Sequence, residues 1–355
     1  MTLEELGYNE DLSRYRQEQN LQSFEIGRIT SQHRERYIVL TEKGELEAEI
    51  IGNLRFSASD RSGFPAVGDW VAISVFNEDD AIIHAIYPRQ NILERQAVGK
   101  FGEKQIIAAN INYALIIQAI DRDFNLNRLE RYLAISYASN IEPVIILSKI
   151  DLVDQDELAI MVDKIARRIR NVQIIAISNI SRDGLEVLIQ LIQKGKTYCF
   201  LGSSGVGKSS LINNLAGRNL LRTDSISEST KKGRHVTSHR EMVVLENGGI
   251  LVDNPGMREI GLADTTDGLE TTFNQIIELS KDCKYSDCRH LNENGCAVLE
   301  ALDQGELERA AYENYLKMER EKVHFQSSIA EKRQKDKEFG KMYKAYQKNR
   351  KQNEF

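Results

Sequence analysis

Alternating hydrophobic and polar positions fill the first part of the chain. They alternate through FEIGRITSQHRERYIVLTEKGELEAEII (24–51), and EKGE interrupts the run as a hairpin turn would. PAVGDWVAISVF (65–76) and AIIHAIYPR (81–89) read as further strands with proline and glycine at their ends. About five short strands between residues 21 and 95 predict a small β-barrel, of which the OB-fold is the common type.

Near residue 105 the pattern changes to apolar runs that alternate with segments of helical periodicity. Strands are expected at 111–120, 142–150, 172–178 and 196–202, and helices at 125–140, 156–171, 183–193 and 208–217. Strands that are apolar throughout are typical of a parallel sheet covered on both faces. Beyond about residue 265 we expect polar helices without strands. The chain therefore divides into an N-terminal extension and barrel (1–97), an α/β domain (98–264) and a helical C-terminal domain (265–355).

Composition and charge narrow the class of protein. With 355 residues, 41% hydrophobic and 28% charged, the chain has the composition of a soluble protein. The N-terminus lacks the apolar run of a signal peptide and no segment is long enough to span a membrane, so we expect a cytoplasmic protein without a membrane partner. Net charge is −6, yet residues 331–355 hold nine Lys/Arg against four Asp/Glu. We interpret that tail as a solvated helix face, with an RNA contact as the alternative.

A phosphate-binding loop lies between a predicted strand and a predicted helix. FLGSSGVGKSS (200–210) contains the pattern Gly-x-x-x-x-Gly-Lys-Ser in that context. Glycines allow the backbone to wrap around phosphate oxygens, Lys208 adds a charge, and the Ser209 hydroxyl is a ligand for Mg²⁺. The predicted nucleotide-binding residues of this loop are Gly202, Ser203, Ser204, Gly205, Val206, Gly207, Lys208, Ser209 and Ser210.

Two later segments add candidate magnesium and phosphate ligands. In GGILVDNPGMRE (248–259), Asp253 follows an apolar strand and is placed to hold Mg²⁺, while the Gly256 N–H can reach the γ-phosphate. The polar segment STKKGRHVTSHRE (229–241) contains Thr237, a candidate second hydroxyl ligand of Mg²⁺. A threonine that joins Mg²⁺ when the γ-phosphate is present is typical of the order–disorder switch of GTPases.

A base-reading motif precedes the phosphate loop by about fifty residues. Ser148, Lys149, Ile150 and Asp151 form Ser-Lys-x-Asp, close to the Asn/Thr-Lys-x-Asp of GTPases. The Asp151 carboxylate can accept from the N1–H and N2–H₂ of guanine, and adenine lacks that donor pair. Ser178 and Asn179 follow the next strand, where GTPases place a loop supporting the guanine O6. The alternative is a strand–helix junction with an incidental aspartate.

Four residues near the C-terminus form a candidate metal site. Cys283, Cys288, His290 and Cys296 lie within fourteen residues. Three thiolates and one imidazole match a closed, structural zinc site, and a reduced cluster without metal is the alternative. Cys199, in the strand before the phosphate loop, is expected in the core.

These motifs together resemble the circularly permuted GTPases of the RsgA (YjeQ) family. The resemblance covers nearly the whole chain and implies an α/β P-loop GTPase domain, permuted, with an N-terminal OB-like barrel and a C-terminal α-helical zinc-binding module. It implies GTP and GDP as ligands, Mg²⁺ with GTP, one structural Zn²⁺ and a monomer. It also implies a role in late maturation of the small (30S) ribosomal subunit, with binding to its rRNA and release on hydrolysis.

The chain departs from this family at two places. Position 148 is serine where the family usually has asparagine, so we expect a weaker brace on the phosphate loop and lower guanine affinity. The family's Gly-x-His-Thr-Thr-Thr reads GRHVTS (233–238) here, which leaves Thr237 as the one matching threonine. Met257 stands where Ras-like enzymes have their water-orienting glutamine, so His235 is the candidate catalytic residue.

Other functions stay open on the sequence alone. One is a GTP/GDP-sensing module whose hydrolysis is incidental and which acts on another RNA or ribosomal partner. Another is a metal-dependent nuclease, disfavoured because four ligands leave zinc no open position. The barrel is expected to contact RNA through a basic set whose alternative is a solubilising surface: Arg28, His33, Arg34, Arg36 and Arg55.

Overall fold

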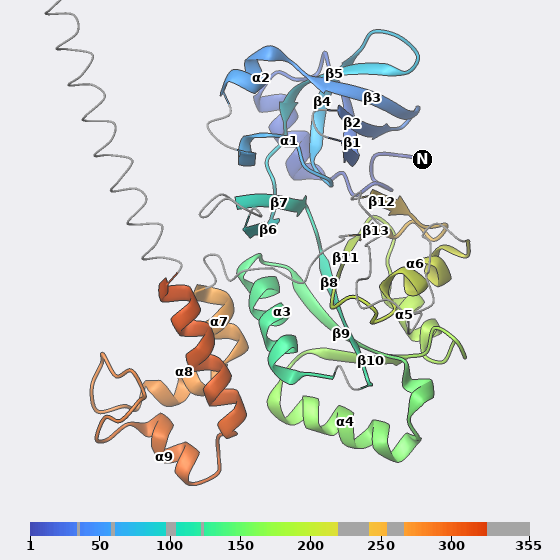
Figure 1. The fold of residues 1–355 in the computed structure, drawn as a ribbon. Coiled ribbons are helices and arrows are strands. Elements are labelled where there is room, and N and C mark those ends of the chain that lie inside the picture. Colours follow the sequence, from blue (N-terminus) through green and yellow to red (C-terminus); the bar gives the residue numbers. More distant parts are fainter. Residues whose placement is uncertain are drawn as a thin grey trace, which may run out of the picture.

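The first domain is a closed five-stranded barrel (Figure 1). The computed structural model describes residues 1–33, 36–57, 61–96, 104–121, 124–218, 241–253 and 266–324. The barrel strands are β1 (Glu25–His33), β2 (Arg36–Thr41), β3 (Gly44–Ile50), β4 (Trp70–Val75) and β5 (Asp80–Ile86). They pair in the order β1-β2-β3-β5-β4, with β3 and β5 parallel, and β4 returns to β1. The predicted OB-like barrel is confirmed.

The period-two pattern of the sequence determines which side chains fill the barrel. Strand β2 alternates, with Tyr37 and Val39 buried between more exposed neighbours. Helix α1 (Glu10–Glu18) begins at Asn9, whose side chain accepts from the Leu12 N–H, and it packs Leu12 into a small cluster with Trp70. The short helices α2 (Gly52–Ser57) and η1 (Arg61–Gly63) connect β3 to β4.

The second domain is a six-stranded sheet with helices on both faces. Its strands are β8 (Tyr113–Ala119), β9 (Glu142–Ser148), β10 (Gln173–Ile177), β11 (Thr197–Leu201), β12 (Glu241–Val244) and β13 (Ile250–Asp253). Their order is β10-β9-β8-β11-β13-β12, with all neighbours parallel except β12 against β13. This confirms the predicted parallel sheet, and β12 is a strand that the pattern did not predict.

Helices cover the sheet in two pairs, each facing its own core cluster. They are α3 (Leu126–Ala138), α4 (Gln155–Arg168), α5 (Leu185–Leu191) and α6 (Lys208–Ala216), with the turn η2 (Ile150–Leu152) before α4. Leu129 of α3 and Ile165 of α4 are buried in one cluster. Leu188 of α5 and Leu211 of α6 are buried in the other. Buried strands between two apolar helix layers explain the uninterrupted apolar runs of the sequence.

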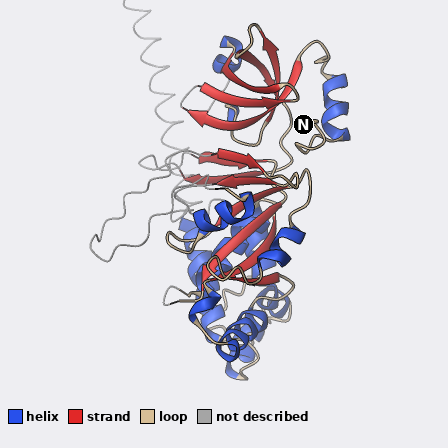
Figure 2. Ribbon diagram, turned by 90° about the vertical axis from the view of Figure 1, so that its right-hand side faces the viewer, coloured by secondary structure: helices blue, strands red, loops and turns tan. Residues whose placement is uncertain are grey.

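The barrel and the second domain are joined by a strand pairing and a buried arginine. Strand β12 meets β1 through Ser31 and Glu241, and a ribbon of β6 (Ile92–Gln96) and β7 (Lys104–Ala109) lies between the two parts (Figure 2). The Arg28 guanidinium, 1% exposed, donates to the carbonyl oxygens of Leu6 (2.6 Å), Gly68 (3.2 Å) and Asn110 (3.2 Å) and to Thr197 Oγ1 (2.9 Å). The interpretation of Arg28 as an RNA contact is therefore wrong, because its side chain is buried and forms these four hydrogen bonds within the protein.

The C-terminal part is helical within the described ranges. It contains α7 (Thr266–Thr272), α8 (Asn274–Ser280), α9 (Ala297–Asp303) and a helix over 309–324. Helix α7 lies directly on α3, because a Cβ on Gly268 would come within 2.0 Å of the Ala134 carbonyl oxygen. Within the described ranges, no helix has the length and apolar composition that a membrane crossing requires.

Buried polar contacts fasten the 309–324 helix to the second domain. Glu130 of α3 forms a bidentate ion pair with Arg168 of α4 at 2.7 Å and accepts from Asn314 Nδ2 at 2.5 Å. Arg131 donates to both carboxylate oxygens of Glu321 at 2.8 and 2.6 Å. Adjacent residues of α3 are therefore bound to two positions of the 309–324 helix that lie seven residues apart, Asn314 and Glu321.

Candidate functional site

The phosphate loop connects β11 to α6 and has the backbone that its glycines were expected to allow. Gly202, Gly205 and Gly207 have φ of 151°, 83° and 95°, values that favour glycine. A Cβ on Gly202 would lie 2.5 Å from the Ile117 carbonyl oxygen, so no other residue fits there. The Lys208 ammonium donates to the carbonyl oxygens of Gly202 (2.7 Å) and Ser203 (2.5 Å). The cation thus lies inside the loop, where phosphate oxygens are expected.

The candidate magnesium ligands lie at the same edge of the sheet. Asp253 ends β13, the parallel neighbour of β11, and is 8% exposed. Carboxyl ends of adjacent parallel strands meet at one edge, so Asp253 and Ser209 of α6 flank the loop. Oxygen ligands of this type suit Mg²⁺. The predicted residues His235, Thr237 and Gly256 lie outside the described residues.

The predicted base-reading residues of two neighbouring loops are joined by a hydrogen bond. Ser178 Oγ lies 2.5 Å from Asp151 Oδ1 and accepts from the backbone N–H groups of Ile180 and Ser181, both at 3.1 Å. Its one hydroxyl proton must then point at Asp151. Ser178 therefore fixes the rotation of the Asp151 carboxylate, although the sequence suggested only that it belongs to the base-support loop.

The remaining residues of these loops make contacts of their own. Ser148 is fully buried, and its hydroxyl donates to the Val206 carbonyl oxygen at 2.7 Å. The short serine side chain thus still reaches the phosphate loop. Lys149 has a left-handed backbone (φ 63°), and its ammonium pairs with Asp121 at 2.8 Å. The Asn179 amide donates to the Gly207 carbonyl oxygen at 3.1 Å.

One contact at the phosphate loop had no signal in the sequence. Arg128, in the first turn of α3, donates from Nη1 to Ser203 Oγ at 2.5 Å. The arginine belongs to an amphipathic helix with no motif around it, so only the fold reveals that it reaches the loop.

Comparison with known proteins agrees with this geometry. The model of the RsgA GTPase family matches residues 86–263. The "small ribosomal subunit biogenesis GTPase RsgA 1" of Bacteroides thetaiotaomicron is 40% identical over 97% of this chain and 96% of its own. A Listeria innocua protein with the same printed name is 43% identical over 91% of this chain and 90% of its own.

The chain belongs to the RsgA GTPase family.

Solved structures support the same family. YjeQ from Thermotoga maritima superposes with a TM-score of 0.62 at 25% identity, covering 83% of this chain and 96% of that one. YloQ, described as a circularly permuted GTPase, superposes with a TM-score of 0.61 at 26% identity, covering 88% and 96%. The permuted order explains how an RsgA GTPase chain can carry its base loop before its phosphate loop and still bring both to one sheet edge.

The cysteine cluster of this RsgA GTPase has the dimensions of a tetrahedral zinc site. The four ligand atoms all lie within 4.8 Å of one another. His290 Nδ1 is 3.6 Å from Cys283 Sγ and 3.4 Å from Cys296 Sγ, and those two sulfurs are 3.9 Å apart. Zinc–sulfur bonds of about 2.3 Å imply sulfur–sulfur distances near 3.8 Å. Burial lowers the pKa of His290, which favours the neutral imidazole that a metal requires.

A carboxylate organises the loop between the ligands. Glu293 accepts from the backbone N–H groups of Arg289 (3.1 Å), Leu291 (2.8 Å) and Asn292 (3.0 Å). These bonds, the one from Asn292 foremost, lower the pKa of Glu293 to about 2. Tyr312 of the 309–324 helix donates to the His290 carbonyl oxygen at 2.5 Å, which holds the ligand loop against the helix.

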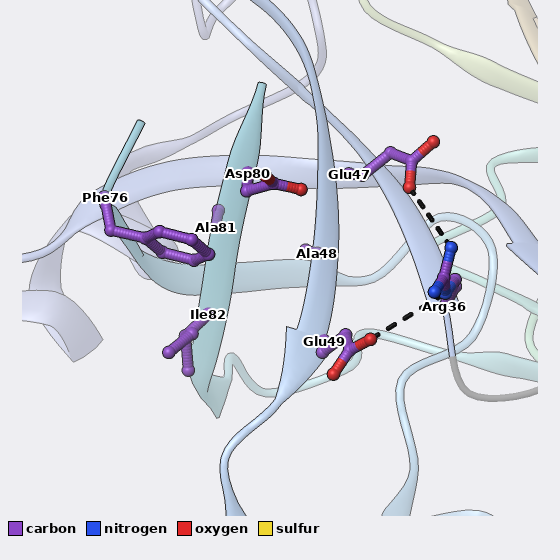
Figure 3. A pocket seen from close by; sticks show the side chains of 8 residues that line it. All are labelled: Arg36, Glu47, Ala48, Glu49, Phe76, Asp80, Ala81 and Ile82. Carbon is purple, nitrogen blue, oxygen red and sulfur yellow. Dashed lines mark ion pairs between the residues drawn. The ribbon is translucent and has the colours of Figure 1, made fainter. Parts of the chain in front are cut away.

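The barrel face around Arg36 is acidic. A cavity of about 320 Å³ there is bordered by Arg36, Glu47, Glu49, Phe76 and Asp80. Figure 3 shows Arg36 between Glu47 and Glu49, with ion-pair distances of 3.8 and 3.7 Å. A phosphate backbone would meet three carboxylates here, so Arg36 is a poor candidate for RNA contact.

Of the remaining barrel residues predicted to contact RNA, His33 and Arg55 are exposed. Arg34 lies outside the described residues.

Proposed function

We propose that this protein is a GTP-hydrolysing assembly factor that acts in late maturation of the small (30S) ribosomal subunit, binds its rRNA and is released on hydrolysis. The observation that carries the proposal is the Asp151 carboxylate, oriented by Ser178, at the same sheet edge as the Lys208 loop. An anionic base reader beside a phosphate cradle selects guanosine triphosphate. The names of the curated relatives support the ribosomal partner.

Each residue of the site has a proposed part in hydrolysis. Gly202, Ser203, Ser204, Gly205, Val206, Gly207, Lys208, Ser209 and Ser210 bind the phosphates, with Gly256. Ser148, Lys149, Ile150, Asp151, Ser178 and Asn179 form the base side of the site. When bound, Mg²⁺ neutralises charge on the β- and γ-phosphate oxygens, and Ser209, Thr237 and Asp253 would hold it. His235 orients the attacking water, with its neutral imidazole accepting a hydrogen bond from it.

The three proposed domains divide the work. The barrel (1–97) and the zinc-binding helical domain (265–355) provide the subunit contacts, and the permuted GTPase domain (98–264) provides the switch. Zinc bound by Cys283, Cys288, His290 and Cys296 holds the ligand loop in shape, with no open position for catalysis. We expect a cytoplasmic monomer.

Sedimentation with purified subunits tests this proposal. In the presence of a non-hydrolysable GTP analogue the full chain should pellet with small subunits, and with GDP it should stay in the supernatant. Large subunits serve as the control and should not retain the protein in either state. Equal retention with GDP and the analogue would contradict release by hydrolysis and would favour a GTP/GDP-sensing module.

A further inference from the structure

Two side chains from two different base loops hold neighbouring carbonyl groups of the phosphate loop. Ser148, at the end of β9, donates from Oγ to the Val206 carbonyl oxygen at 2.7 Å. Asn179, after β10, donates from Nδ2 to the Gly207 carbonyl oxygen at 3.1 Å. Val206 and Gly207 immediately precede Lys208, so both bonds act on the turn from which the loop enters α6.

The surrounding hydrogen bonds determine the orientation of the Asn179 amide. The Gly207 carbonyl is an acceptor only, so the Asn179 nitrogen must face it. Asn214 of α6 donates to Asn179 Oδ1 at 3.2 Å and to its backbone oxygen at 3.1 Å. A Cβ on Gly207 would lie 2.8 Å from Asn179 Nδ2, so the amide packs directly on that glycine. Asn179 thus joins the base loop to the phosphate loop and to α6 at once.

The serine at 148 gives this arrangement its significance. An asparagine at that position offers two amide donors, whereas a serine hydroxyl offers one. The one Ser148 donor is used by Val206, which leaves Gly207 without a partner from that residue. The Gly207 carbonyl oxygen accepts from the Leu211 N–H of α6 at 2.9 Å, and the Asn179 amide provides a second, side-chain donor from the other loop.

We propose that Asn179 is a positioning residue of the nucleotide site, which shares with Ser148 the bracing of the phosphate loop. Its amide acts on the phosphate side of the site and does not read the guanine O6. This inference rests on the proposed GTP-binding function and assigns the roles of two residues within it.

Binding of two nucleotides to the full chain separates bracing from base reading. GTP carries the guanine O6, whereas 2-aminopurine riboside triphosphate lacks it. Loss of one net hydrogen bond corresponds to about a fivefold to tenfold change in affinity. Asn179→Ala should weaken both nucleotides by the same factor of that size. Ser181→Ala is the matched control, because its hydroxyl bonds only within the same loop, to Asp183, and it should change neither affinity.

Two outcomes of this binding experiment would overturn the inference. A loss confined to GTP would mean that Asn179 reads the O6, and no loss with either nucleotide would mean that it braces nothing. If the unaltered chain showed no preference for GTP over ATP, the proposed function itself would fail, so the two failures are distinguishable.

A second set of variants tests the shared role. Ser148→Asn introduced into the Asn179→Ala chain should return GTP affinity to within about twofold of the original, because one asparagine then offers both donors. No recovery in a folded chain would contradict the exchange. Ser148 is fully buried, and alanine at this position avoids placing the larger asparagine side chain there. The double-mutant cycle of Ser148→Ala and Asn179→Ala therefore provides an independent test. Each brace partly compensates for the loss of the other, so the combined loss should exceed the product of the single losses. A simple product would overturn the shared brace.

Discussion

Asp151→Asn is expected to move nucleotide preference from GTP to xanthosine triphosphate. Ser178 Oγ accepts hydrogen bonds from two backbone N–H groups. Its only hydroxyl proton is donated to Asp151 Oδ1. An asparagine at 151 must therefore place its carbonyl oxygen toward Ser178 and its NH₂ group toward the base. That donor would face the guanine 2-amino group, another donor, whereas the 2-oxo group of xanthine accepts it.

The size of the effect follows from the bonds that change. A hydrogen bond to a charged group contributes about 1.5–3 kcal/mol, and a buried donor left without a partner costs about 1–3 kcal/mol. The two together give about 2.5–6 kcal/mol, or a loss of GTP affinity between about sixtyfold and twenty-thousandfold. Xanthosine triphosphate should gain enough to become the preferred ligand.

Calorimetric titration of each chain with GTP and with xanthosine triphosphate measures both affinities directly, without a guanine probe that the variant would itself bind weakly. Asp154→Asn is the matched control, since it removes the same charge three residues away. Asp154 caps α4 by accepting from the Glu157 N–H at 2.8 Å, and asparagine caps helices equally well. That variant should keep the original preference. Retention of GTP preference by Asp151→Asn would refute the assignment of this loop to the base.

Three further changes test other parts of the account. His235→Ala should keep GTP affinity and lose the turnover stimulated by small subunits, measured as phosphate release; unchanged stimulation would exclude the histidine. Glu293→Gln should weaken zinc binding about tenfold in competition with a chelator, because the loop that presents His290 loses its anion, whereas Glu313→Gln on the neighbouring helix should have no effect. Arg28→Met should lower the free energy of unfolding, measured in urea, by about 3 kcal/mol or more, because four acceptors lose a donor. Burial lowers the pKa of Arg28 to about 10, so the side chain is charged at pH 7. The loss of stability should therefore not vary between pH 6 and 8.

The chain's local patterns predicted the elements, and long-range contacts decided what several residues do. An apolar run such as 142–150 predicts a buried strand because the whole signal lies within a few consecutive residues. Strand β12 is four residues long and half-exposed, so its pattern carries too little signal to predict. Arg28 looks like any surface arginine in the sequence, and only the packing of the barrel on Thr197 shows that it is buried.

The candidate site divides in the same way. Residue spacing alone was enough to predict the phosphate loop, the base aspartate and the four zinc ligands, because each motif is a short contiguous stretch. The partners of Ser203 and Gly207 come from residues 75 and 28 positions away, Arg128 and Asn179, and no local spacing encodes such contacts. From position 148 alone we expected a weak brace on the phosphate loop. The contact of Asn179 with Gly207 could not enter that expectation, because it depends on how two loops meet in space.

The rate of GTP hydrolysis in the presence of ribosomal subunits distinguishes a small-subunit assembly factor from a protein that only senses the nucleotide. Turnover should be measured for the full chain alone, with purified small subunits and with purified large subunits at equal concentration. We predict slow turnover alone and with large subunits, and stimulation confined to small subunits. Equal rates under all three conditions would contradict this prediction.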